Sequence, residues 1–143
     1  MVSAQTNQKF LSRNIVTQYD FDPDATSATD VAWVDMRDAG VFTVGFFRTV
    51  GTSNLTFHIL ANSASDGSGS DVTVKTYSGE EPNAVGDYCF LECTAQELAA
   101  LGTDLRYVSA NLTVATGTDE AVVTYIRSDL RFPRADATAD TIA

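Results

Sequence analysis

The single histidine is the residue in this 143-residue sequence most suited to acid–base chemistry. A histidine that acts as a general base needs a nucleophile and an orienting acid nearby. The sequence has no Gly-x-Ser-x-Gly motif that would present a nucleophile on a sharp turn. In a strand, His58 would point away from the apolar face that carries Phe57 and Ile59. We therefore favour a solvent-facing or interface histidine over a catalytic one.

Three aspartates have the alternate spacing that opens a calcium-binding loop. They are Asp20, Asp22 and Asp24. Such a loop also needs glycine at its sixth position and glutamate at its twelfth, where this sequence has Ala25 and Val31. We expect a solvated acidic loop from Asp20 onward, and a divalent ion at a subunit boundary is the alternative.

Cys89 and Cys93 are the two cysteines. In a strand they would lie about 13 Å apart, whereas a disulfide requires Cα atoms within about 7 Å. The spacing therefore predicts two buried thiols on the same side of a strand. No second Cys or His pair accompanies them as zinc sites require. The sequence thus predicts no metal, no cofactor and no enzymatic activity.

Acidic residues outnumber basic ones by 19 to 9, which gives a formal net charge of −10. Such a charge disfavours nucleic acid as a partner, because that affinity comes largely from Lys and Arg. It also disfavours anionic membranes, and no apolar run approaches the roughly 20 residues of a membrane span. The acidity suits high solubility, saline surroundings or a partner with basic patches.

A basic stretch near the end of the sequence departs from this acidity. Arg127, Arg131 and Arg134 follow one another within eight positions. They could pair with the protein's own carboxylates, or they could contact an acidic patch on a partner. The sequence leaves both interpretations open.

Strand signals recur along most of the chain. Runs of β-branched and aromatic residues that alternate with polar ones, at intervals of 8–15 residues, predict about eight strands. One short helix is predicted over 94–101, because Thr94 and Glu97 form a capping box and Gly102 follows as a stop. The fold class is therefore mainly all-β: an antiparallel sandwich or barrel-like domain with extended N- and C-terminal arms.

The expected organisation is one β domain between two polar ends. Residues 1–13 are predicted to form an N-terminal arm, 14–134 a single β domain, and 135–143 a polar C-terminal tail.

Several residues inside the domain carry more detailed predictions. Gly45, inside a strand, indicates a bulge or a close backbone approach. The stretch 62–71, with its Gly and Ser residues, is typical of a flexible polar loop. Trp33 and the pair Phe46-Phe47 are most simply core residues.

The order of these segments resembles small structural proteins of tailed bacteriophages, of the head-decoration or capsid cement type. The resemblance covers roughly residues 30–135, and its motifs are structural. Its motifs are Ala32–Arg37, the strand Val41–Arg48, Gly51-Thr52, Leu55–Ala61, the loop Ser65–Ser70, Glu92 with Glu97-Leu98, Leu105–Thr118 and Asp129–Ala135.

The resemblance implies a virion protein on the outer capsid surface, made in the bacterial host cytoplasm. It would bridge major capsid protein subunits and stabilise the shell. The implied partners are the major capsid protein and further copies of the chain, with a homo-trimer as the candidate oligomer. We expect the capsid contact at Lys9, Phe10, Leu11 and Arg13 in the arm and at Arg127, Arg131 and Arg134.

Two other classes of protein remain as alternatives. One is a phage tail or neck component, or a glycan- or receptor-binding β-sandwich. Glycan sites present Tyr or Trp on loops; Tyr19, Tyr77 and Tyr88 are the loop-edge candidates, whereas Trp33 is expected in a strand. The other is a small hydrolase, which would need His58 paired with an acid in a pocket.

Overall fold

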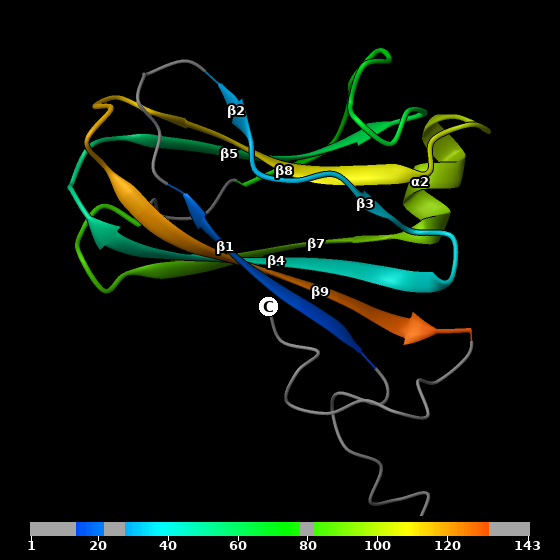
Figure 1. Ribbon diagram of the computed structural model, residues 1–143, viewed down its shortest axis with the longest axis horizontal. Helices are drawn as coiled ribbons and strands as arrows, with labels where there is room; N and C mark the ends of the chain where they lie inside the picture. Colours follow the sequence, from blue (N-terminus) through cyan, green and yellow to red (C-terminus); the bar gives the residue numbers. More distant parts are fainter. Residues whose placement is uncertain (1–13, 22–27, 78–81, 132–143) are drawn as a thin grey trace, which may run out of the picture.

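Two antiparallel β-sheets pack face to face, and one short helix lies at one end of the sandwich (Figure 1). The structure is a computed structural model that describes residues 14–21, 28–77 and 82–131. One sheet has the order β1 (Ile15–Phe21), β9 (Glu120–Leu130), β4 (Ala39–Val50) and β7 (Tyr88–Thr94). The other has the order β2 (Thr29–Asp30), β8 (Tyr107–Val114), β5 (Leu55–Asn62) and β6 (Val72–Thr76), with β3 (Val34–Asp35) also on β8. The predicted antiparallel sandwich is confirmed.

The strand pairing is nested from the chain ends inward. β1 pairs with β9, β2 and β3 pair with β8, β4 pairs with β7, and β5 pairs with β6. This pattern, divided between two sheets, is that of a jelly roll. Because β1 is antiparallel to β9, Ile15 lies opposite Arg127. The described chain therefore begins and ends at the same end of the sandwich, where α2 and β3 also lie (Figure 1).

The core forms between the inner faces of the two sheets. Phe42, Val44 and Phe46 alternate along β4 and are buried, as are Phe57 and Ile59 on β5. This two-residue period is the pattern from which the sandwich was predicted.

Tyr125, also buried, ties the two sheets together through its hydroxyl group. That group accepts a hydrogen bond from the Ala110 N–H (2.8 Å) and donates one to the Ala32 carbonyl (2.9 Å). It therefore satisfies one backbone group of β8 and one of the irregular segment between β2 and β3, which would otherwise be costly to bury.

The helix α2 (Ala95–Leu101) confirms the predicted helix and its signals. Thr94 is the N-cap: its Oγ1 accepts a hydrogen bond from the Glu97 N–H (3.2 Å), and a Glu97 carboxylate oxygen accepts one from the Thr94 N–H (2.8 Å). Gly102 is the C-cap residue, and Leu98 is the side chain that the helix buries.

The predicted acidic loop begins later than expected. Asp20 and Phe21 belong to β1, where they pair with Val122 and Ala121. Burial of the Phe21 side chain in the core extends the strand to this point. Asp22 and Asp24 lie outside the described residues.

The structure differs from the prediction at Gly45. A phenyl carbon of Phe90 lies 2.9 Å from the point where a Gly45 Cβ would be, so a side chain, and not another backbone, approaches this glycine closely. The bulge is wrong, because Gly45 pairs in register with both neighbouring strands. The irregularity of β4 lies between Arg48 and Val50 instead.

The stretch 62–71 is more ordered than the predicted flexible loop. Asn62 ends β5 and is fully buried. Its amide donates hydrogen bonds to the Asp71 carboxylate (2.7 Å) and to the Gly67 carbonyl (3.2 Å). The Trp33 indole packs against Gly67, whose positive φ of 73° suits glycine. Trp33 is therefore half-buried over this loop rather than in the core.

Phe46 and Phe47 separate onto opposite faces of their sheet. Phe46 is buried as predicted, but Phe47 is 46% exposed. Adjacent residues of a strand point to opposite faces, so one of the two had to leave the core.

Candidate interaction site at the cationic end

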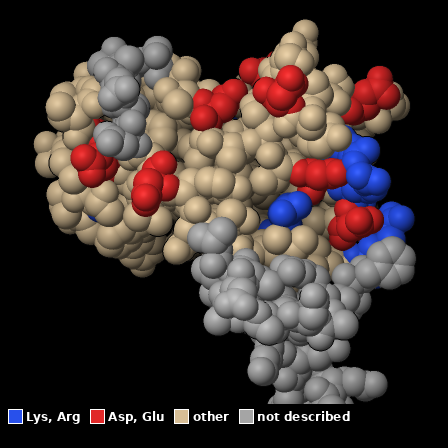
Figure 2. Space-filling view, in the orientation of Figure 1, with Lys and Arg blue, Asp and Glu red and all other residues tan. Residues whose placement is uncertain are grey.

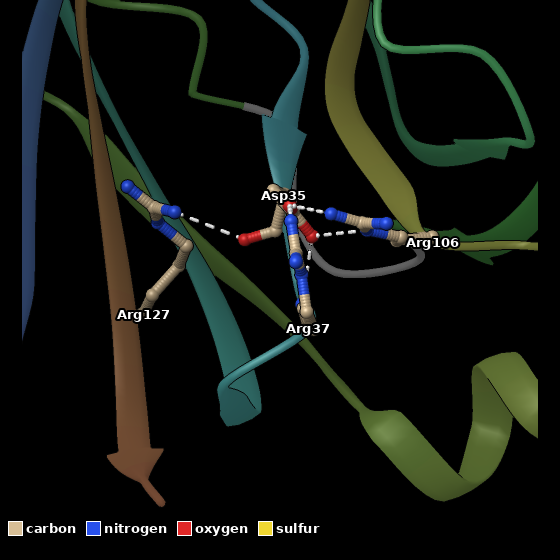
Figure 3. Close-up of polar contacts among 4 residues, drawn as sticks. All are labelled: Asp35, Arg37, Arg106 and Arg127. Atoms are coloured by element: carbon tan, nitrogen blue, oxygen red, sulfur yellow. Dashed lines mark hydrogen bonds and ion pairs between the residues drawn. The ribbon is translucent and has the colours of Figure 1, made fainter. Parts of the chain in front are cut away.

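Three arginines converge on Asp35 where β3 meets the ends of β8 and β9 (Figure 3). Arg106 Nε donates a hydrogen bond to Asp35 Oδ1 (2.8 Å), and Arg37 Nη2 lies 3.1 Å from Asp35 Oδ2. Arg127 Nη1 donates to the backbone carbonyl of Asp35 (2.9 Å). Asp35 thus binds three guanidinium groups, two through its carboxylate and one through its backbone carbonyl.

Strand pairing brings these residues together from distant parts of the sequence. Asp35 lies opposite Tyr107, so Arg106, just before β8, lies beside it. Arg37 follows two residues later, at the turn into β4. Arg127 comes from the other sheet and reaches Asp35 across the end of the sandwich.

The cluster is open to solvent. The Arg37 side chain is 64% exposed and that of Arg106 is 38% exposed. The hydrogen bond to Asp35 raises the pKa of Arg106 above its ordinary value, so its positive charge is further secured. A pocket of about 140 Å³ lies beside the cluster and is lined in part by Ile15, Asp38 and Arg127.

Arg131 adds a fourth cation at this end. It is exposed, and its backbone N–H donates to the Asp38 carbonyl (2.8 Å). A second pocket, of about 220 Å³, is lined by Arg37 and Arg131 together with Asp38 and Asp129. We call this end of the sandwich the cationic end, defined by Arg37, Arg106, Arg127 and Arg131.

Four of the six Lys and Arg residues within the described part of the chain lie at this end. Most of the blue side chains visible in Figure 2 gather there, beside red ones, whereas red ones predominate over the rest of the visible face. Of the other two cations, Lys75 pairs with Glu97 on α2 (2.6 Å). Arg48 is buried at the opposite end against Asp119 (2.7 Å).

The structure places the predicted contact residues as follows. Arg127 and Arg131 lie together at the cationic end, where Arg127 donates a hydrogen bond to the backbone carbonyl of Asp35. Lys9, Phe10, Leu11, Arg13 and Arg134 lie outside the described residues, as does the tail 135–143. Sequence reasoning missed Arg37 and Arg106, because only the pairing of β3 with β8 reveals that they belong to the same site.

The candidate catalytic and metal-binding residues lie apart from one another. His58 Nδ1 is 3.0 Å from Thr76 Oγ1 on the adjacent strand. Cys89 and Cys93 are both free thiols, and burial raises the pKa of each to about 12. Within 14–21, 28–77 and 82–131, no group of three or more His, Cys, Asp or Glu side chains could hold a metal ion.

The aromatic residues predicted for glycan binding differ in exposure. Tyr19 packs edge-on against Tyr125, and Tyr77 packs near Phe57. Tyr88 is 67% exposed on β7.

Comparison with known proteins finds weak structural similarity. No family model matches the sequence, and no curated protein matches it. A solved structure from the disulfide-linked pili of Bacillus endospore appendages is 12% identical, with a TM-score of 0.42 over 80% of this chain and 86% of that one. The Yersinia pseudotuberculosis-derived mitogen is 8% identical, with a TM-score of 0.46 over 88% of this chain and 92% of its own. At these values neither similarity indicates a function.

The described helix is also far from the dimensions of a membrane span. No helix in this part of the chain is long and apolar enough to cross a bilayer.

Proposed function

We propose that this protein is a structural virion protein that decorates the outer surface of a phage capsid and stabilises it by bridging major capsid protein subunits. The gathering of Arg37, Arg106, Arg127 and Arg131 at one end of an otherwise acidic sandwich is the observation that supports it most directly. A charge pattern of this kind orients a protein on an acidic partner surface.

The position of the chain ends also supports the proposal. The described chain begins at Asn14 and ends at Arg131, both at the cationic end. The predicted contact residues of the arm and Arg134 follow directly on from these points in the sequence. This end of the molecule thus carries Arg127 and Arg131. The segments that contain the other expected contact residues are joined to the described chain at the same end.

The fold is compatible with this role without specifying it. Jelly rolls occur in viral capsid domains and in lectins, so the fold alone does not distinguish decoration from glycan binding. The cationic end favours a negatively charged partner over neutral glycans, which offer no charge for its arginines to recognise. In this proposal the protein has no catalytic activity and needs no cofactor.

Co-sedimentation with capsid shells tests the proposal. The full chain would be mixed with shells assembled from the major capsid protein encoded in the same genome. We expect the chain to sediment with the shells, and binding to weaken as salt is raised, because arginine–carboxylate contacts are screened.

Charge reversal at the cationic end tests the assigned surface. The double substitution Arg37→Glu with Arg131→Glu should weaken binding by more than about tenfold. Lys75→Glu is the control, since Lys75 is also partly exposed but lies on β6, two strands away from β8. Failure of the unaltered chain to bind shells would refute the decoration role. Normal binding by the double variant would refute the surface.

A further inference from the structure

The outer face of β7 and β4 exposes a row of aromatic side chains. Tyr88 is 67% exposed, Phe90 is 58% exposed and Phe47 is 46% exposed. Phe47 lies directly opposite Tyr88 in the strand register, and the rings of Tyr88 and Phe90 meet edge-on with centroids 5.8 Å apart. We call these three side chains the aromatic face. It lies on one side of the sandwich, separate from the cationic end.

The backbone of β7 is also available for pairing. Arg48 N–H donates to the Asp87 carbonyl (2.9 Å), which fixes which residues of β7 bond to β4. By the alternation of an antiparallel ladder, Cys89, Leu91 and Cys93 bond to β4. The N–H and C=O groups of Tyr88, Phe90 and Glu92 point to the opposite side, where no other strand of the described residues pairs with β7.

The other sheet edges carry features that discourage pairing. β2 and β3 have two residues each. β6 carries Lys75 and has an irregular register with β5. β1 presents the charged Asp20. Short strands, lysines, irregularities and charges are the devices by which natural edges avoid association. β7, with seven residues in regular register, has no Lys, Arg or Pro, and like β1 it carries one exposed carboxylate, Glu92.

We propose that β7 and the aromatic face form a homodimer interface, in which β7 of a second copy pairs antiparallel with β7 of the first. The edge groups centre on Phe90, so the two-fold axis places Phe90 opposite Phe90 of the second copy. Tyr88 then lies opposite Glu92 of the second copy, where its hydroxyl can donate to that carboxylate. About six backbone hydrogen bonds would join the two four-stranded sheets into one.

The exposed aromatic area lies only in part at the proposed axis. At roughly 200 Å² per aromatic side chain, the exposed fractions of Tyr88 and Phe90 amount to about 250 Å² in each copy. Pairing into one continuous sheet covers the flanks of these two side chains, whereas Phe47 lies one strand further in, on β4. The interface is therefore small, so the dimer should depend on concentration.

Charge is compatible with a second copy in this register. The two Glu92 residues would lie about 14 Å apart along the paired strands, which is beyond the screening length of about 8 Å at physiological salt. Each copy carries a net charge of −10, so the remaining repulsion is long-range. Added salt should therefore strengthen this association.

Sedimentation velocity of the full chain over a range of concentrations tests the proposal. We expect a monomer–dimer equilibrium that shifts toward dimer as salt is raised. Phe90→Lys and Phe90→Glu should each weaken dimerisation by more than about tenfold, because each places like charges opposite one another at the axis. Leu101→Lys is the control, since Leu101 is 48% exposed on α2.

Mixing the two Phe90 variants tests the register itself. A copy with Lys at position 90 and a copy with Glu there would place opposite charges across the axis, so the mixture should dimerise where neither variant does alone. A merely destabilised fold would not show this rescue, and circular dichroism of each variant checks that the fold is retained.

Three outcomes would overturn the proposal. The unaltered chain could remain monomeric at millimolar concentration, or its association could be unaffected by both Phe90 variants. The mixture could also fail to dimerise while both variants stay folded. Because no capsid is present in this experiment, its failure would leave the proposed decoration role intact.

Discussion

Arg48 and Arg37 show how one residue type serves two purposes in this protein. The Arg48 side chain is 1% exposed, and it donates to Asp119 (2.7 Å), the Pro82 carbonyl (2.6 Å) and the Ser53 carbonyl (2.8 Å). Arg37 is largely exposed and shares its carboxylate with Arg106. The first arginine is fully committed to the fold, whereas the second retains donors for a partner.

Asp119 is the counter-charge that makes burial of Arg48 tolerable. Burial opposes ionisation of Asp119, but hydrogen bonds from Ser53 and Arg48 outweigh it and hold the pKa of the carboxyl below its usual value. Removal of one member of a buried ion pair leaves the other charged and unpaired. We expect Asp119→Ala to reduce the free energy of unfolding by about 3–5 kcal/mol in urea denaturation.

The exposed Asp104 provides the comparison, and Asp104→Ala should change stability by less than about 0.5 kcal/mol. A loss below about 1 kcal/mol for Asp119→Ala would contradict the assigned role of the pair.

Three buried side chains that ionise at alkaline pH predict that the protein becomes less stable there. Burial raises the pKa of Cys89 and Cys93 from 9.0, and that of Tyr125 from 10.0, to about 12 in each case. Between pH 9 and 12 the unfolded chain therefore loses protons that the folded chain retains, and the free energy of unfolding falls as pH rises. Urea denaturation under reducing conditions at successive pH values measures this fall.

In the double variant Cys89→Ala with Cys93→Ala, Tyr125 is the remaining group of the three. The free energy of unfolding should therefore begin to fall near pH 10 instead of near pH 9. Constant stability from pH 8 to 11 would argue against buried thiols.

Among the secondary-structure elements, α2 begins and ends at positions that are set by residues next to it in the sequence. The capping box between Thr94 and Glu97 satisfies backbone groups at its start, and Glu97 also pairs with Lys75. Thr94→Ala should cost about 1 kcal/mol of stability, measured by thermal or urea unfolding. Thr103→Ala, just beyond the helix, should cost little; equal effects of the two substitutions would show that the cap is not the cause.

Local patterns predicted the elements well because their signals lie within a few residues. The alternation of β4 and the capping residues of α2 are of this kind. The same alternation placed Arg48 on the inner face with Phe42, Val44 and Phe46, and it placed Phe47 outside. Strict use of the two-residue period could therefore have found both the buried arginine and the exposed phenylalanine.

The sites could not be predicted in the same way, because they depend on contacts between distant residues. Asp119 is 71 positions from Arg48, and Arg106 is 71 positions from Asp35. No spacing in the sequence indicates that either pair meets. The edge position of β7, which distinguishes the aromatic face from a core strand, likewise follows only from the strand order.

On the scale of the whole molecule, the two proposed contacts respond to salt in opposite directions. The cationic end would attract an acidic partner, and salt screens that attraction. The aromatic face would join two acidic copies, and salt relieves their repulsion. Measurements of shell binding and of dimerisation across the same salt series should therefore diverge, which separates the two surfaces without any substitution.

The nested strand pairing also makes the protein a candidate display scaffold. Because the described chain begins and ends at the cationic end, the turn at Thr116–Thr118 between β8 and β9 lies at the far end of the sandwich. Thr116 and Thr118 are exposed there. A foreign peptide inserted at this turn would point away from whatever surface the cationic end binds, so a shell coated with such a fusion would present the peptide outward in many copies.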